Sequence, residues 1–336
     1  SIAMIKSSFS HFLLLLAAMF LCFECTSTID DTNTQEEEEY VEIGFKSSFI
    51  DYSETPMYPT RAFSDRDVFG VEIRDENGNA YACWLTSDLG KDVVKLMKNK
   101  RYACYLVYMP NGRDIVETYS DGTLGLPFCT SAYGTESSPK LNEGVYYGGK
   151  HTISFCDQGC VLKKGMQSMG YAYNLWSDVD IYYGITEICS SEDITITINL
   201  YRMMFGLNVS VKNLKEGEIK VSETSTLATY VYTLTPSSPS MNKVLELRSM
   251  PFYTVFPTPD SLPTDDQMLN WTSGGWINIV YVNPAGEEFL ILNKEIETKR
   301  LTRYSFSFDM NDFFDNYTSS IQAQIMDDNW SDANLN

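Results

Sequence analysis

The chain has 336 residues, a formal net charge of −20, and 43% hydrophobic and 13% aromatic residues. This length and apolar content suffice for one large domain or two average ones with buried cores. The acidic balance and the lack of any basic stripe argue against a nucleic-acid-binding protein, because Lys and Arg side chains bind phosphate backbones. We therefore expect no nucleic-acid partner.

Residues 1–25 are predicted to form a signal peptide that ends in a lipid-attachment region. Lys6 precedes an uninterrupted apolar run at residues 12–21, and Glu24 closes this region soon afterwards. An apolar core of about 7–15 residues behind a positive charge is typical of export signals, whereas a membrane-spanning helix needs about 20 apolar residues. The run is therefore interpreted as an export signal.

Two cysteines stand at the end of this leader, before small and acidic residues. The stretch "CTSTIDD", which begins at Cys25, resembles the lipid-modification site and acidic export tag of surface lipoproteins in the Bacteroidetes. Cys25 is the first candidate for lipidation and Cys22 the alternative, because Glu24 is an unusual residue before such a cut. Cleavage without lipid attachment is the remaining alternative. Residues 26–39, with four consecutive glutamates, are expected to form a solvated acidic tether.

The cysteines beyond the leader select no single disulfide pattern. An exported chain can oxidise them, and six cysteines allow 15 pairings. Buried free thiols that pack as small apolar side chains are an equal expectation. Two of the cysteines lie near His151, but a structural zinc site needs paired ligands and a fourth donor, so we predict no metal. The six residues are Cys83, Cys104, Cys129, Cys156, Cys160 and Cys189.

Alternation of apolar and polar residues predicts antiparallel β-strands with one apolar face in most of the remaining chain. Asn77-Gly78 predicts a tight hairpin because both positions tolerate positive φ, and Gly217 and residues 284–286 are further turn signals. Residues 93–97 are compatible with a short helix but are interpreted as a strand. The clearest alternating runs are residues 102–109, 194–203, 207–214 and 304–310.

A weak internal likeness predicts two tandem domains. Residues 71–108 and 280–308 each contain a strand, a glycine turn, a second strand, a basic turn and an alternating strand. This likeness favours two β-sandwich domains with a boundary near Cys189–Ile196. The expected N-terminal sandwich is residues 40–192, with long Gly- and Tyr-rich loops, and the expected C-terminal sandwich is residues 193–336, with a tail strand.

Residues 131–183 lose the alternation and are rich in Gly, Ser and Tyr, which indicates long loops with short strands. Loops on a rigid sandwich often carry binding sites. The aromatic residues in this region could contact a glycan or a partner protein, or they could fill the core beneath the loops. The candidate ligand-loop residues are Tyr146, Tyr147, Trp176 and Tyr182.

The sequence contains no recognisable catalytic constellation. His151 is the only histidine beyond the leader, and no GxSxG elbow, phosphate loop or dinucleotide fingerprint is present. Asp178 and Asp180 stand beside aromatic residues, as the paired carboxylates of a glycosidase could, but acidic residues are common in such loops. We therefore expect no enzyme and no cofactor.

Several stretches resemble the fimbrillin superfamily of Bacteroidales, the type V pilins and their lipoprotein relatives. The closest match is "ITINLYRMMFGLNVSVKNLKEGEIKVS", in which Leu200 and Arg202 precede a Gly-x-x-Val strand. "VFGVEIRDENGNAYACW" resembles the first-domain core, and "EIETKRLTRYSFSFDM" resembles a late strand pair. The resemblance implies an all-β protein of two transthyretin-like Greek-key sandwiches, exported to the outer membrane or cell surface as a lipoprotein, with an adhesive role in a pilus or fimbria.

The resemblance also implies assembly by strand exchange. In such pilins a trypsin-like protease cuts after an arginine behind the first strand, which leaves and is replaced by a donor strand from another subunit. Here the first strand would be residues 41–49 and the processing site Arg61, with Arg66 as the alternative. Pro56 and Pro59 favour an extended, exposed loop around Arg61. A plain solvated arginine is the other interpretation of Arg61.

The tail contains an alternating segment that could serve as the donor strand, formed by Ile321, Ala323 and Ile325. Alternatively, the tail pairs within its own domain, as in an anchor, a tip subunit or a non-assembling relative. The implied partners are other fimbrillin subunits or a second copy, the membrane through a lipid, and a host glycan or protein. The alternative function is a surface glycan-binding lipoprotein that uses the Tyr- and Trp-rich loops.

Overall fold

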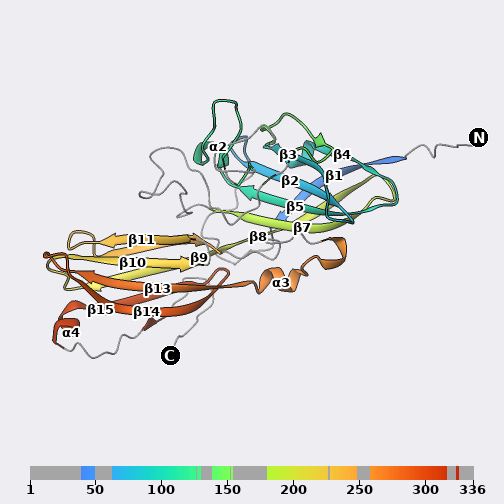
Figure 1. The fold of residues 1–336 in the computed structure, drawn as a ribbon. Coiled ribbons are helices and arrows are strands. Elements are labelled where there is room, and N and C mark those ends of the chain that lie inside the picture. Colours follow the sequence, from blue (N-terminus) through green and yellow to red (C-terminus); the bar gives the residue numbers. More distant parts are fainter. Residues whose placement is uncertain are drawn as a thin grey trace, which may run out of the picture. The chain divides into compact units, whose positions relative to one another are not determined.

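A computed structural model of the chain describes residues 39–49, 63–125, 127–129, 138–151, 153, 180–225, 228–247, 258–315 and 323–324 (Figure 1). Residues 1–39 form one unit and residues 40–336 another, and every element below belongs to the second. The expected signal peptide and most of the tether lie outside the described residues. Among the helices that are described, none is long and apolar enough to cross a membrane.

The described elements are mostly strands, as the alternation predicts. The strands are β1 (Tyr40–Phe49), β2 (Val68–Asp75), β3 (Ala80–Thr86), β4 (Val93–Met97), β5 (Arg101–Met109), β6 (Tyr146–Tyr147), β7 (Tyr182–Cys189), β8 (Ile194–Arg202), β9 (Met204–Lys212), β10 (Glu218–Ser225), β11 (Ala228–Leu234), β12 (Ser240–Glu246), β13 (Thr272–Val282), β14 (Glu288–Lys299), β15 (Arg303–Asp309) and β16 (Ala323–Gln324). The short helices are η1 (Leu89–Lys91), α2 (Gly112–Ile115), η2 (Pro259–Ser261), α3 (Asp265–Leu269) and α4 (Met310–Asp315).

The first eight strands form one sheet in the order β4-β1-β8-β7-β5-β2-β3-β6. All described pairings in this sheet are antiparallel except that of β1 with β8. Both faces are covered, because alternate residues of β5 enter two different cores: Tyr102 and Cys104 pack in one, and Ala103 and Tyr105 in the other. The central strand β5 is therefore buried on both sides.

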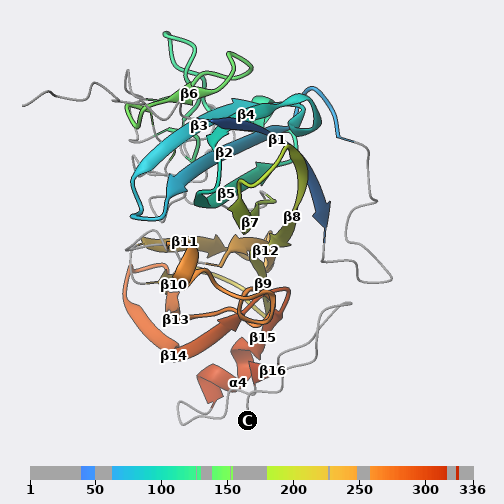
Figure 2. The same cartoon turned by 90° about the vertical axis from the view of Figure 1, so that its right-hand side faces the viewer.

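The later strands form a β-sandwich of two four-stranded sheets, β11-β10-β13-β14 and β12-β9-β15-β16 (Figure 2). Leu207 and Val209 of β9 share one core with Ile277 and Ile279 of β13. The period-two pattern of these strands explains the arrangement, since each strand presents one apolar face to the opposite sheet. An all-β fold is thus confirmed.

All three predicted turns contain a glycine with positive φ. Gly78 (φ +81°) lies in the β2–β3 hairpin, and Gly286 (φ +85°) lies in the β13–β14 hairpin. Gly217 (φ +71°) connects β9 to β10, which lie in different sheets, so this turn does not form a hairpin. A Cβ at Gly217 would lie 2.4 Å from the carbonyl oxygen of Val282, so this close approach requires glycine. Residues 93–97 form a strand, as expected.

The chain passes from the first sheet to the sandwich later than expected, because the expected boundary lay between residues 192 and 193. Strand β8 follows that boundary, yet it pairs with β1 and β7 of the first sheet, and its Ile198 and Leu200 enter a core of that sheet. Only Met203 separates β8 from β9, the first strand of the sandwich. Alternation reports which side chains face inward but does not report which sheet a strand joins.

Candidate functional site

Strand β1 occupies a slot between β4, to which it is antiparallel, and β8, to which it is parallel. Val41, Ile43 and Phe45 are buried, with exposed fractions of 6%, 0% and 1%, and Phe45 lies 5.3 Å from Trp84 between ring centroids. Glu42 points to solvent between them. Burying each such apolar side chain contributes about 1.5–3 kcal/mol. The strand is thus held by backbone pairing on both edges and by alternate side chains beneath.

Strand β4 depends on β1 for its place in the sheet. It stands at the end of the strand order, and β1 is its only strand partner in the described part of the chain. Val94 and Leu96 turn inward and are fully buried. On the outer face, Lys95 lies opposite Glu42, with 3.8 Å between their charged atoms. Removal of β1 would therefore leave β4 without a neighbouring strand and would uncover apolar side chains.

The structure describes only one of the two candidate sites for proteolytic processing. Arg61 lies outside the described residues. Arg66 is exposed and forms an ion pair of 2.6 Å with Asp114. Its backbone lies in a turn closed by Asp67, whose buried carboxylate accepts hydrogen bonds of 2.9 Å from the backbone amides of Ser64 and Asn111. A protease binds its substrate extended, so this turn disfavours a cut at Arg66 relative to Arg61.

The tail makes a short pairing with its own sandwich. Ala323 lies opposite Phe306, and Gln324 lies opposite Ser305, so that β16 adds an antiparallel neighbour to β15. Ile321 and Ile325, the other donor-strand candidates, lie outside the described residues. The donor role of this segment stays a prediction.

The candidate ligand-loop residues are not gathered into one site by the described structure. Tyr182 lies in β7 and packs against Tyr108 at 5.5 Å between ring centroids, in the core that contains β1. Tyr146 packs on the opposite core and lies 4.3 Å from the ring of His151. The hydroxyl of Tyr147 accepts a hydrogen bond from the backbone amide of Lys95 in β4. Trp176 lies outside the described residues.

Of the groups considered for catalysis or metal binding, Asp180 has a charged partner, whereas the buried Nδ1 of His151 has no hydrogen-bond partner among the described residues. Asp180 forms an ion pair with Arg202, while Asp178 lies outside the described residues. Glu72 is fully buried and accepts hydrogen bonds of 2.7 Å from Arg74 and 2.8 Å from the amide of Ile153. Burial raises the pKa of Glu72. No group of three or more His, Cys, Asp or Glu residues in the described part of the chain could hold a metal.

The four described cysteines are free thiols. Cys83, Cys104 and Cys129 are buried, and Cys189 is exposed. Burial raises the pKa of the Cys83 and Cys104 thiols, so both stay protonated and unreactive near neutral pH. Cys156 and Cys160 lie outside the described residues, as do the lipidation candidates Cys22 and Cys25.

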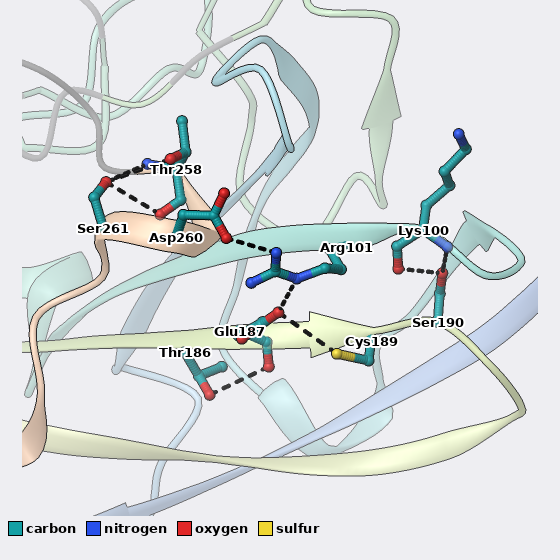
Figure 3. Close-up of polar contacts among 9 residues, drawn as sticks. All are labelled: Lys100, Arg101, Thr186, Glu187, Cys189, Ser190, Thr258, Asp260 and Ser261. Carbon is teal, nitrogen blue, oxygen red and sulfur yellow. Dashed lines mark hydrogen bonds and ion pairs between the residues drawn. The ribbon is translucent and has the colours of Figure 1, made fainter.

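A cluster of charges joins η2 to the first sheet (Figure 3). The guanidinium of Arg101 in β5 lies 2.5 Å from the Glu187 carboxylate in β7 and 2.6 Å from Asp260 in η2. The sulfur of Cys189 lies 3.6 Å from the same Glu187 oxygen. The Arg101 side chain is 45% exposed, so solvent screening weakens these ion pairs. We interpret these ion pairs as contacts that hold η2 against the first sheet.

Asp67 and Tyr81 are the residues that the sequence analysis missed around the β1 slot. Asp67 immediately precedes β2, and an aspartate at such a position often caps a turn, which is the signal that could have identified it. Tyr81 donates a hydrogen bond of 3.2 Å to the Lys95 carbonyl. No sequence signal indicates this contact, because the two residues meet only after the sheet has curved.

Comparisons with known protein families and with characterised protein sequences found no match. Solved structures similar to the chain include a candidate adhesin from Bacteroides ovatus (10% identity, 88% of this chain and 95% of that chain, TM-score 0.40). Another is a candidate adhesin from Bacteroides thetaiotaomicron (12%, 87% and 96%, 0.38). A third is the fimbrial anchor protein Mfa2 from Porphyromonas gingivalis (12%, 80% and 90%, 0.37). The strand pairing and cores of the chain itself, rather than these likenesses, establish its β-sheet fold.

Proposed function

We propose that the chain is a fimbrillin-like surface protein of a fimbria, in which the β1 slot is the site where another subunit is joined by strand exchange. The observation that carries the proposal is the position of β1 between β4 and β8, with Ile43 and Phe45 in the core. A strand held in this way can be replaced by another of similar pattern without change to the rest of the sheet. The fimbrillin resemblance of the sequence supports the same assignment.

The physical requirements of exchange fit this slot. Both neighbouring strands have backbone groups that must be paired again once β1 leaves, and such open edges are templates for an incoming strand. The incoming strand also needs apolar side chains at every second position, to replace Val41, Ile43 and Phe45. A segment with the alternation of Ile321, Ala323 and Ile325 has this pattern. Such a segment would come from a different subunit.

The short pairing of β16 with β15 favours a terminal or accessory position for this subunit. A tail that pairs within its own sandwich is not available to a neighbour, whereas the β1 slot is independent of the tail. In this arrangement the chain accepts a strand and does not donate one. The proposed role is adhesion at the cell surface, with no catalytic step.

The proposed surface attachment is a lipid on Cys25, followed by the acidic tether. Metabolic labelling with an alkyne fatty acid tests it: Cys25→Ala abolishes labelling of the mature protein, whereas Cys22→Ala leaves it intact. Labelling that persists in Cys25→Ala and disappears in Cys22→Ala would contradict the proposal and identify Cys22 as the lipidated residue.

Limited cleavage by a trypsin-like protease tests the processing step. We expect a cut after Arg61 and a folded body that begins at residue 62, read by intact mass and circular dichroism. Arg61→Ala abolishes this cut, and the matched control Arg66→Ala is cut like the wild type. A body that unfolds on cleavage, or a cut that persists in Arg61→Ala, contradicts the proposal.

A further inference from the structure

The outward face of the sheet β11-β10-β13-β14 exposes several apolar side chains. Val231 of β11, Trp276 of β13 and Leu290 of β14 are 42%, 48% and 57% exposed. Leu290 is paired with Val280, which is also partly exposed. Trp276 makes no ring contact with another described residue. An exposed indole on a rigid sheet is a feature of binding surfaces.

A row of uncharged polar side chains crosses the same face next to Trp276. Ser222, Asn278 and Asn293 are direct cross-strand neighbours on β10, β13 and β14. None of the three side chains hydrogen-bonds to another residue in the described part of the chain. The side-chain oxygen of Asn278 is covered from solvent without a partner. With strands about 4.8 Å apart, the row is about 10 Å long, the length of a disaccharide.

The charges around the row favour an uncharged ligand. The ammonium group of Lys220 lies 3.2 Å from Glu288 and 3.9 Å from Glu218, so its charge is neutralised within the face. On the other side of the row, Glu295 lies opposite Trp276 on β14, and Glu297 follows it along the same strand. The remaining charge is therefore negative and repels anionic ligands.

We propose that this face, which is separate from the β1 slot, binds a neutral glycan. The indole of Trp276 stacks on the C–H face of a sugar ring, Ser222 and Asn293 exchange hydrogen bonds with its hydroxyl groups, and the side-chain nitrogen of Asn278 donates to one of them. A flat apolar protein partner fits less well, because it would bury the three polar side chains without hydrogen bonds, which is unfavourable for each group. A sugar presents both an apolar face and hydroxyl groups, as this surface requires.

Isothermal titration calorimetry with cellopentaose, xylopentaose, mannopentaose and maltopentaose tests the proposal. We expect at least one of these neutral oligosaccharides to bind the wild type. Trp276→Ala weakens that binding by about tenfold or more, through loss of stacking and apolar contact. Asn293→Ala weakens it by about two- to tenfold, through loss of one hydrogen bond. A trigalacturonate probe, which is anionic, binds less tightly than the neutral ligand.

Phe63→Ala is the matched control, because it removes an aromatic side chain that is 45% exposed and lies outside this sheet, and it is expected to leave the affinity unchanged. Thermal unfolding of each variant confirms that the fold is kept. The proposal is overturned if none of the four oligosaccharides binds, if Trp276→Ala binds like the wild type, or if trigalacturonate binds more tightly. Processing at Arg61 is expected to be normal in Trp276→Ala, so failure here is distinguishable from failure of strand exchange.

Discussion

The phenolic oxygen of Tyr147 accepts a hydrogen bond of 2.9 Å from the backbone amide of Lys95. The hydroxyl of Tyr81 donates one of 3.2 Å to the carbonyl of the same residue. Both backbone groups of Lys95 on the outer edge of β4 are thus satisfied by side chains. This arrangement closes an edge strand against further pairing at that point, and it directs strand exchange to the β1 side.

Tyr147→Phe is expected to lower the free energy of unfolding by about 0.5–1.5 kcal/mol, because the Lys95 amide loses its side-chain acceptor. Urea denaturation measures the change. Tyr146→Phe is the control, since the hydrogen bond that its hydroxyl donates goes to the exposed side chain of Glu143, and it is expected to have a smaller effect. Equal losses of unfolding free energy in the two variants would show that the contact of Tyr147 with β4 stabilises the fold no more than the contact of Tyr146 with Glu143.

Phe45→Ala is expected to destabilise the chain by about 3–5 kcal/mol, because it leaves a cavity beside Trp84 in the core beneath β1. Chemical denaturation of the two proteins gives this difference. Lys46→Ala, an exposed substitution in the same strand, should remain within about 0.5 kcal/mol of the wild type. A mild effect of Phe45→Ala would mean that β1 contributes little to the fold.

The buried carboxyl of Glu72 predicts a pH dependence of stability. Burial raises its pKa in the folded chain above the value of 4.5 that it has when exposed, so the folded state holds the proton more tightly than the unfolded state. Stability contributed by this group is therefore present below pH 4.5 and is lost as the pH rises through the folded pKa. Relative to Glu72→Gln, the wild type should lose stability over this interval.

Asp309 provides the comparison of opposite sign. Hydrogen bonds from the Asn213 side chain and the Asn311 amide lower its pKa below 3.8, so its contribution is present above pH 3.8 and is lost as the pH falls. Denaturation series at several pH values, with Glu72→Gln and Asp309→Asn beside the wild type, measure both slopes. Slopes of the same sign for the two residues would contradict this account.

Thiol accessibility follows the described environments. Maleimide labelling of the native protein, mapped by peptide mass, should modify Cys189 rapidly and Cys83 and Cys104 only after unfolding, because burial keeps these two thiols protonated and out of reach. Labelling of Cys104 at the rate of Cys189 would show that the core of the first sheet opens readily.

Local patterns predicted the strands well and their partners poorly. The alternation in residues 304–310 and the Asn77-Gly78 signal each report a property of a few neighbouring residues, and both agree with the structure. The placement of β8 beside β1 depends on residues about 150 positions apart, and a single sequence carries no signal for such a pairing.

The candidate site shows the same difference between local features, which were predicted, and contacts between distant residues, which were not. The first strand, which the family resemblance implied at residues 41–49, is present as β1 at Tyr40–Phe49. Tyr147 was assigned to a ligand loop because the surrounding sequence is rich in Gly and Tyr. Its contact with Lys95 forms only in the folded sheet, where β3 and β6 both lie against β4. Trp276 was not predicted as a surface residue, because its neighbour Ile277 is also apolar and alternation therefore does not indicate which of the two faces outward.

The most direct test of the account measures whether the β1 slot accepts a new strand. A fluorescent peptide with the sequence of residues 40–49 is mixed with the intact protein and with protein cut at Arg61, and its incorporation is followed by fluorescence polarisation. The account predicts incorporation only after the cut, and none for a peptide that carries Ile43→Asp. Equal incorporation into uncut protein, or none into cut and folded protein, would contradict it.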